Sequence, residues 1–308
     1  MKINYFLTTQ SFDRTNYKSL FGALCGMFSD IKGLEAYFDE NRFFICRDVL
    51  LLKVDGGMTL LELSCSSAIP SNVRYAISTI LDMTSHNSKY LQISESSSVD
   101  VIEYTSNNDE QECTAIIADE SAPLDDKNYG PVYNQKTCID LRRKYWGYYI
   151  NDTGKYLQQC RKYYTNLFFL PNVDETIDSI YNDCKKQITQ ALSSLNDVYY
   201  PYYQGLGLNI VSQQEQMSWL KSKCDIDVCP QGKKKKKLKA EFSFPGDEGK
   251  SIVLFCGLHV KFDYTDKGTT FSNDRRLHFH EPHSKVLKSK KVLIAHIGGH
   301  LEQKGYKK

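Results

Sequence analysis

The spacing of apolar residues changes near residue 240, and this change constrains the fold more than any other feature of the chain. Upstream, apolar residues recur three and four positions apart, as they do on one face of an α-helix. From Ala240 onward they alternate with polar residues, as they do in a half-buried strand. A helical stretch followed by a run of strands is typical of the α+β class. We therefore expect an α+β fold that ends in a small antiparallel or mixed sheet.

The 308 residues divide by pattern into three regions. Residues 1–120 show both helical and strand patterns, residues 131–230 are helical and rich in tyrosine, and residues 238–308 form a basic, histidine-rich β module. The stretch 119–130 is acidic and contains proline and glycine, so we expect it to be a linker.

The first region carries local signals of both kinds. Apolar residues at helical spacing predict helices, and short apolar runs bounded by turn residues predict strands. The elements expected here are a helix over 72–83, strands over 43–46, 49–54 and 58–63, and a hairpin formed by 99–104 and 113–118.

The middle region has its clearest helix over 174–195, where Asp174 can cap the first amides. Eleven of the 21 tyrosines lie between Tyr145 and Tyr203. Tyrosines at helical spacing are typical of a core or a protein interface. The alternative is that they stack on bases, as aromatic side chains do in proteins that bind single-stranded nucleic acid.

Basic residues and histidines gather at the C-terminal end. Residues 231–308 hold 18 lysines and arginines against 8 acidic residues, together with six of the seven histidines. We expect nucleic-acid phosphates to be contacted by Lys233, Lys234, Lys235, Lys236, Lys237 and Arg275. The alternative for the lysine run is a solvated loop between domains.

Strand alternation brings possible catalytic side chains together. Strands are expected over 240–244, 252–264, 276–280 and 291–297. Pairing of the second with the third would form one polar, cationic surface, because alternate residues share a face. Together with two histidines that close the chain's last strand, the candidate catalytic residues are His278, His280, Arg276, His259, Lys261, His296 and His300.

This surface would suit two chemistries. In metal-free RNA cleavage, one imidazole takes the proton of a ribose 2′-OH and a cationic side chain stabilises the charged phosphorane. Neighbouring positive charges would lower the pKa of the histidines, so that a neutral imidazole can act as the base. In the alternative, His278, His280 and His259 bind a divalent metal such as zinc. In a third interpretation, the histidines are structural and the chain is a binding subunit without catalysis.

The stretch Arg276-Leu277-His278-Phe279-His280, with the later Lys291-Val292-Leu293-Ile294-Ala295-His296-Ile297-Gly298-Gly299-His300, resembles the end of RelE/ParE-type ribonuclease toxins. The resemblance covers about 60 residues. It implies a small twisted sheet that cuts RNA without a cofactor, with Arg276 as the strand arginine and His296 to His300 as the closing segment. The chain departs from the family in its long preceding region and in its many histidines. This arrangement would fit the effector of a prokaryotic antiviral-defence system.

The remaining expectations concern partners and compartment. No apolar run approaches the ~20 residues of a membrane span, and the ten scattered cysteines are typical of reduced thiols in the cytoplasm. A protein partner is expected to bind the N-terminal or tyrosine-rich region. The sequence contains no phosphate-binding loop motif, so any ATP hydrolysis would need a separate ATPase subunit.

Overall fold

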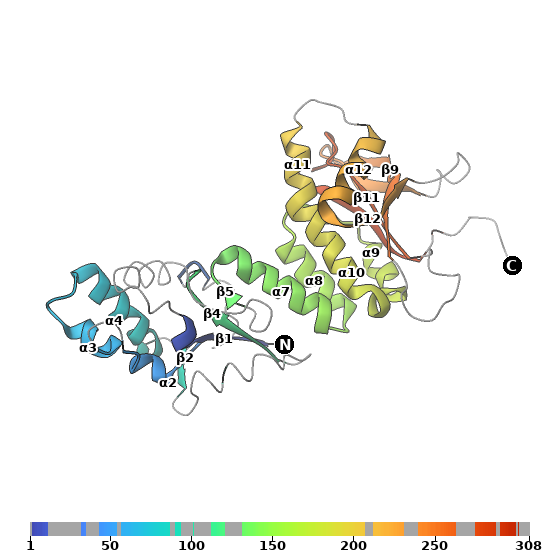
Figure 1. The fold of residues 1–308 in the computed structure, drawn as a ribbon. Helices are drawn as coiled ribbons and strands as arrows, with labels where there is room; N and C mark the ends of the chain where they lie inside the picture. Colours follow the sequence, from blue (N-terminus) through green and yellow to red (C-terminus); the bar gives the residue numbers. More distant parts are fainter. Residues whose placement is uncertain are drawn as a thin grey trace. The chain divides into compact units, whose positions relative to one another are not determined.

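The structure, a computed structural model, divides the chain into two compact units. The N-terminal unit comprises residues 1–145 and the C-terminal unit residues 146–308, and each is described by itself (Figure 1). Both contain helices and sheets, which confirms the α+β class. The residues described are 2–11, 32–34, 43–53, 57–86, 90–93, 101, 112–120, 131–206, 212–230, 240–262, 275–287, 290–299 and 301.

The N-terminal unit is built on a parallel five-stranded sheet in the order β3-β2-β1-β4-β5. Its central strand, β1, alternates so that Ile3, Tyr5 and Leu7 are all buried. The strands are β1 (Lys2–Leu7), β2 (Phe43–Cys46), β3 (Tyr90–Ile93), β4 (Glu112–Ile117) and β5 (Pro131–Val132). The helices are η1 (Thr9–Ser11), α2 (Arg47–Leu50), α3 (Leu60–Cys65), α4 (Ser71–His86) and α7 (Gln135–Tyr149), of which α7 extends past residue 145.

Two of the predicted strands in this unit are mostly wrong. Val49 and Leu50 belong to α2 and residues 60–63 to α3, and only Lys53 and Thr59 pair, in an isolated antiparallel bridge. A capping box begins α3: the Glu62 amide donates to the Thr59 hydroxyl over 3.2 Å, and the Thr59 amide donates to the Glu62 carboxylate over 2.7 Å. This reciprocal pair satisfies amides that a helix start leaves open, which favours helix over strand.

The other predictions for this unit have mixed outcomes. The expected helix over 72–83 is confirmed by α4. The expected strand over 113–118 is present as β4, but it pairs in parallel with β1 and β5 rather than in a hairpin. Its predicted hairpin partner over 99–104 lies mostly outside the described residues, and Val101 is helical.

The C-terminal unit contains a mixed sheet in the order β6-β12-β11-β10-β7. All its pairs are antiparallel except β12 with β6, which confirms the expected small mixed sheet. The strands are β6 (Leu167–Phe169), β7 (Val228–Pro230), β10 (Leu258–Lys261), β11 (Arg276–His280) and β12 (Val292–Gly298). A separate antiparallel hairpin consists of β8 (Glu241–Pro245) and β9 (Ser251–Phe255).

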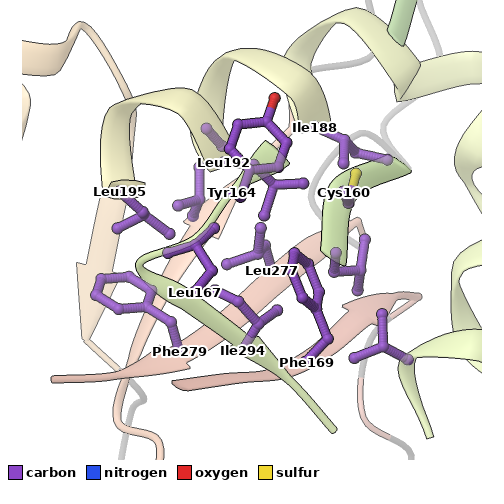
Figure 2. Close-up of a cluster of buried hydrophobic side chains, with 14 of the residues drawn as sticks. Cys160, Tyr164, Leu167, Phe169, Ile188, Leu192, Leu195, Leu277, Phe279 and Ile294 are labelled. Atoms are coloured by element: carbon purple, nitrogen blue, oxygen red, sulfur yellow. The ribbon is translucent and has the colours of Figure 1, made fainter. Parts of the chain in front are cut away.

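Helices cover one face of this mixed sheet. They are α8 (Thr153–Tyr163), α9 (Val173–Thr176), η3 (Ile177–Ser179), α10 (Tyr181–Ser194), the π-helical turn η4 (Leu195–Tyr199), α11 (Tyr200–Gly205) and α12 (Gln213–Cys224). The single helix expected over 174–195 is therefore a series of shorter helical pieces. In Figure 2, Ile188 and Leu192 of α10 face Leu277, Phe279 and Ile294 of the sheet, forming one buried core.

This shared core joins two regions that the sequence patterns separate. Strand β6, from the tyrosine-rich region, pairs with β12 of the β module, and both regions belong to the C-terminal unit. Tyr156, Tyr164, Tyr181 and Tyr199 are buried in this core, so these four tyrosines pack in the interior rather than offering faces to bases. Among the helices of the described residues, none is long and apolar enough to cross a membrane.

Candidate functional site

Three histidines lie in a row across neighbouring strands of the C-terminal unit. His259 of β10 stands opposite His278 of β11, which stands opposite His296 of β12. The ring centroids are 4.9 Å apart for the first pair and 5.9 Å apart for the second. The predicted pairing of the second and third strands is therefore confirmed. We call these three residues the histidine row.

The histidine row is buried, so the expected open cationic surface is not observed at its centre. His278 is 0% exposed, His259 2% and His296 6%. The β8–β9 hairpin covers the row, and the Phe242 ring lies 6.3 Å from that of His278 and 6.5 Å from that of His296. Alternation predicts which side chains share a face, but it cannot reveal that another part of the chain covers that face.

Burial disfavours the charged forms of His278 and His296. The pKa of His278 is lowered to about 3, chiefly because burial removes water from the charged form and then because His259 repels it. Burial also lowers the pKa of His296. The pKa values of these two residues are lowered, as the sequence predicts, but desolvation rather than neighbouring charge is the largest cause.

Hydrogen bonds define the tautomers in the row. Since a carbonyl can only accept, His278 donates from Nδ1 to the Cys256 oxygen over 3.3 Å, and its neutral Nε2 carries a lone pair. Within the described part of the chain, that buried Nε2 has no hydrogen-bond partner. His296 donates from Nε2 to the Gly299 oxygen over 2.9 Å.

The expected metal-ligand alternative finds no geometric support here. Among the described residues, no group of three or more His, Cys, Asp or Glu side chains is placed to hold a metal ion. His280, one of the three expected metal ligands, lies outside the histidine row and donates to the Glu281 carbonyl oxygen.

A second pair of imidazoles lies at the end of β11, where the side chains are partly exposed. The ring centroids of His280 and His283 are 5.9 Å apart and the ring planes meet at 76°. Between them in the sequence, Glu281 has a carboxylate oxygen 3.7 Å from His280 Nδ1. The side chain of His280 is 15% exposed and that of Glu281 35%, so this pair is partly exposed to solvent while the histidine row stays covered.

The two rings present complementary nitrogens. His280 donates from Nδ1 to the Glu281 carbonyl oxygen over 2.7 Å, so the Nε2 of the neutral ring can accept a proton. His283 accepts at Nδ1 from the Lys285 amide over 3.3 Å, so its neutral ring carries the proton on Nε2. Partial burial and the neighbouring His280 lower the pKa of His283, which keeps that ring neutral. We call His280 and His283 the reacting pair.

An aromatic residue supports the loop of the reacting pair. The Tyr203 hydroxyl, from α11, donates to the Pro282 carbonyl oxygen over 3.3 Å. Burial and the negative charge of Glu281 raise the pKa of Tyr203, so its hydroxyl keeps its proton. The loop is thereby anchored to a helix of the same unit.

The remaining predicted site residues are dispersed. Lys261 stands opposite Arg276 as expected, and both are partly exposed. Lys261 also lines a pocket of about 280 Å³ beside α10 and α12. Arg275 forms an ion pair with Asp183 at 2.5 Å, which gives its guanidinium a structural role. His300 and Lys233–Lys237 lie outside the described residues.

His283 is not among the site residues that the sequence predicts, and the structure places it beside His280. Its signal was the spacing His280-x-x-His283 directly after a strand, with Pro282 restricting the backbone between them. The structure brings these rings together and separates His280 from the covered row.

Comparisons with known proteins found no similarity. No protein family matches the chain, and neither a curated protein nor a solved structure resembles it at a significant level.

Proposed function

We propose that the C-terminal unit cleaves RNA without a metal ion, with His280 and His283 as the imidazoles that act on the substrate. The observation that supports this proposal is the complementary protonation of the reacting pair, one ring offering a lone pair and the other an N–H at a 5.9 Å ring separation. General base catalysis requires a lone pair within reach of the 2′-OH, and stabilisation of the transition state requires a hydrogen-bond donor near the phosphate.

The reaction is an internal transesterification. His280 Nε2 takes the proton of a ribose 2′-OH, the 2′-oxygen bonds to phosphorus, and the bond from phosphorus to the 5′-oxygen breaks. The 5′-oxygen takes a proton from water and His280 returns its own proton to solvent. The products are therefore a 2′,3′-cyclic phosphate and a 5′-hydroxyl.

Two neighbours support the charges that form in this reaction. The Glu281 carboxylate, 3.7 Å from Nδ1, stabilises the positive charge on His280 after this residue accepts the proton. His283 donates from Nε2 to a phosphate oxygen and stabilises its negative charge in the transition state.

The resemblance to RelE/ParE-type toxins supports an RNA substrate and a place in antiviral defence. The N-terminal unit would then bind a protein partner or sense a signal, and a separate ATPase subunit would supply any ATP hydrolysis. We place the protein in the cytoplasm, in keeping with the nine described cysteines, all of which are free thiols.

A second candidate is a nucleic-acid-binding subunit that does not cleave. The excess of lysine and arginine in residues 231–308 favours it, because such an excess binds phosphates whether or not a reaction follows.

The test is to incubate the purified full chain with total RNA, with and without EDTA, and to map the new ends. We expect cleavage to survive EDTA, to leave cyclic phosphates, and to fall at least ~100-fold in His280→Gln. His86→Gln, the same change at the end of α4 in the other unit, is the matched control. Loss of cleavage in EDTA, or full activity in His280→Gln, would overturn the proposal. Binding without cleavage would favour the second candidate.

A further inference from the structure

The β8–β9 hairpin contacts both the histidine row and the loop of the reacting pair. On one side, its Phe242 ring lies against His278 and His296. On the other, the Asp247 amide in its turn donates to the Lys285 carbonyl oxygen over 2.9 Å. The amide of the same Lys285 donates to His283 Nδ1. One residue thus connects the hairpin to a reacting imidazole.

The hairpin depends on its apolar contacts to stay in place. It consists of two strands joined by five residue pairs, and a two-stranded hairpin alone is marginally stable in water. Its inward side chains Phe244 and Leu254 are buried in a small core with Leu293 and Ala295 of β12, while outward residues such as Val253 are exposed. This small core and the histidine row occupy the same face of the mixed sheet.

Three side chains near His278 disfavour a positive charge on it: His259 from β10, His296 from β12 and Arg276 from its own strand. The Cys256 carbonyl, which accepts a hydrogen bond from Nδ1, favours the charge, but its effect is smaller than that of burial. Strand β8 contributes the apolar Phe242. Burial raises the pKa of the Cys256 thiol, and the negative charge of Glu281 raises it further. A positive charge on the row would therefore be buried and repelled by other histidines and an arginine.

We propose that protonation of the histidine row releases the β8–β9 hairpin that covers it. When the hairpin is displaced, water reaches the row and the hydrogen bonds through Lys285 that orient His283 are lost. We therefore expect cleavage by the reacting pair to decrease at acid pH. The effect on cleavage rests on the proposed function, whereas the opening of the hairpin does not.

The sign and size of the effect follow from linkage. The pKa of His278 is about 3 when covered, against an ordinary value of about 6.5 in water, so the open form binds the proton more tightly. The stability of the covered form relative to the open form is greatest above pH ~6.5 and decreases as the pH falls toward 3. For this one proton, the open population rises ~25-fold between pH 7 and pH 5.

The test is hydrogen–deuterium exchange of the full chain at pH 7, 6 and 5, corrected for the intrinsic pH dependence of amide exchange. We expect exchange in 241–255 and 283–287 to rise ~25-fold from pH 7 to pH 5 while 188–194 of α10 stays protected. His278→Gln should reduce this rise, since glutamine does not titrate and only the other histidines of the row can then take up a proton. If that variant fails to fold, His296→Gln should lower the rise, and His86→Gln should leave it unchanged.

The possible failures are distinguishable. Unchanged protection of 241–255 at pH 5, or an equal loss of protection in α10, would contradict the proposal that protonation releases the hairpin. Opening of the hairpin in a chain that cuts no RNA at any pH would overturn the proposed function alone.

Discussion

Replacing Gly147 by alanine tests how closely α7 and α10 pack in the C-terminal unit. A Cβ atom at Gly147 would lie 2.6 Å from Thr189 Cβ, closer than side-chain atoms approach one another. Thr189 is 4% exposed, and its hydroxyl shares a 2.9 Å hydrogen bond with that of Tyr156. The added methyl group therefore has no space unless Thr189 moves and that hydrogen bond breaks.

The net effect can be worked out from three contributions. Overpacking at a tight contact destabilises by ~1–3 kcal/mol. Loss of the hydroxyl hydrogen bond adds ~1 kcal/mol. The better helix propensity of alanine offsets ~1 kcal/mol. We therefore expect Gly147→Ala to lower the free energy of unfolding by ~1–3 kcal/mol. At an open helix position the same change would raise it.

Urea unfolding monitored by tryptophan fluorescence measures this effect directly. Both tryptophans of the chain, Trp146 and Trp219, lie in the C-terminal unit, so the signal reports that unit. Gly154→Ala is the control, because the nearest atom to its Cβ is 3.4 Å away, and it should be neutral or stabilising. A Gly147→Ala protein as stable as the wild type would refute the close approach of the two helices.

Two further predictions concern the core and the lysine run. Leu277→Ala, at a fully buried position between sheet and helices, should lower the free energy of unfolding by ~2–5 kcal/mol in the same assay, and a change below ~1 kcal/mol would contradict the described core. Replacing Lys233–Lys237 with glycine and serine should change stability by less than ~0.5 kcal/mol. The same replacement should flatten the salt dependence of RNA affinity, and an unchanged slope would mean that the run contacts no phosphate.

The N-terminal unit shows where local patterns mislead. Short apolar runs over 49–54 and 58–63 are consistent with strands or with brief helices, and periodicity cannot decide between them at this length. The decisive signal in the second run was polar: Thr59 and Glu62, three residues apart, form the capping box that begins α3. Pairing in the sheet is a non-local property, so the parallel neighbours of β4 were not predictable from its own residues.

In the C-terminal unit, the sequence alone predicted the strands over 276–280 and 291–297, because alternation is a local property of an extended backbone. The single strand expected over 252–264 is instead two strands, β9 and β10, in different sheets, and β6 and β7 were not predicted. The pairing of His259 with His278 follows the alternation pattern. Only the tertiary structure decided which histidines solvent can reach. The β8–β9 hairpin folds over the row and lowers the pKa of His278, while His280 and His283 lie beyond it and take opposite tautomers from nearby backbone groups. Burial depends on contacts between distant segments, and those contacts give different solvent exposure to histidines that the sequence pattern groups together.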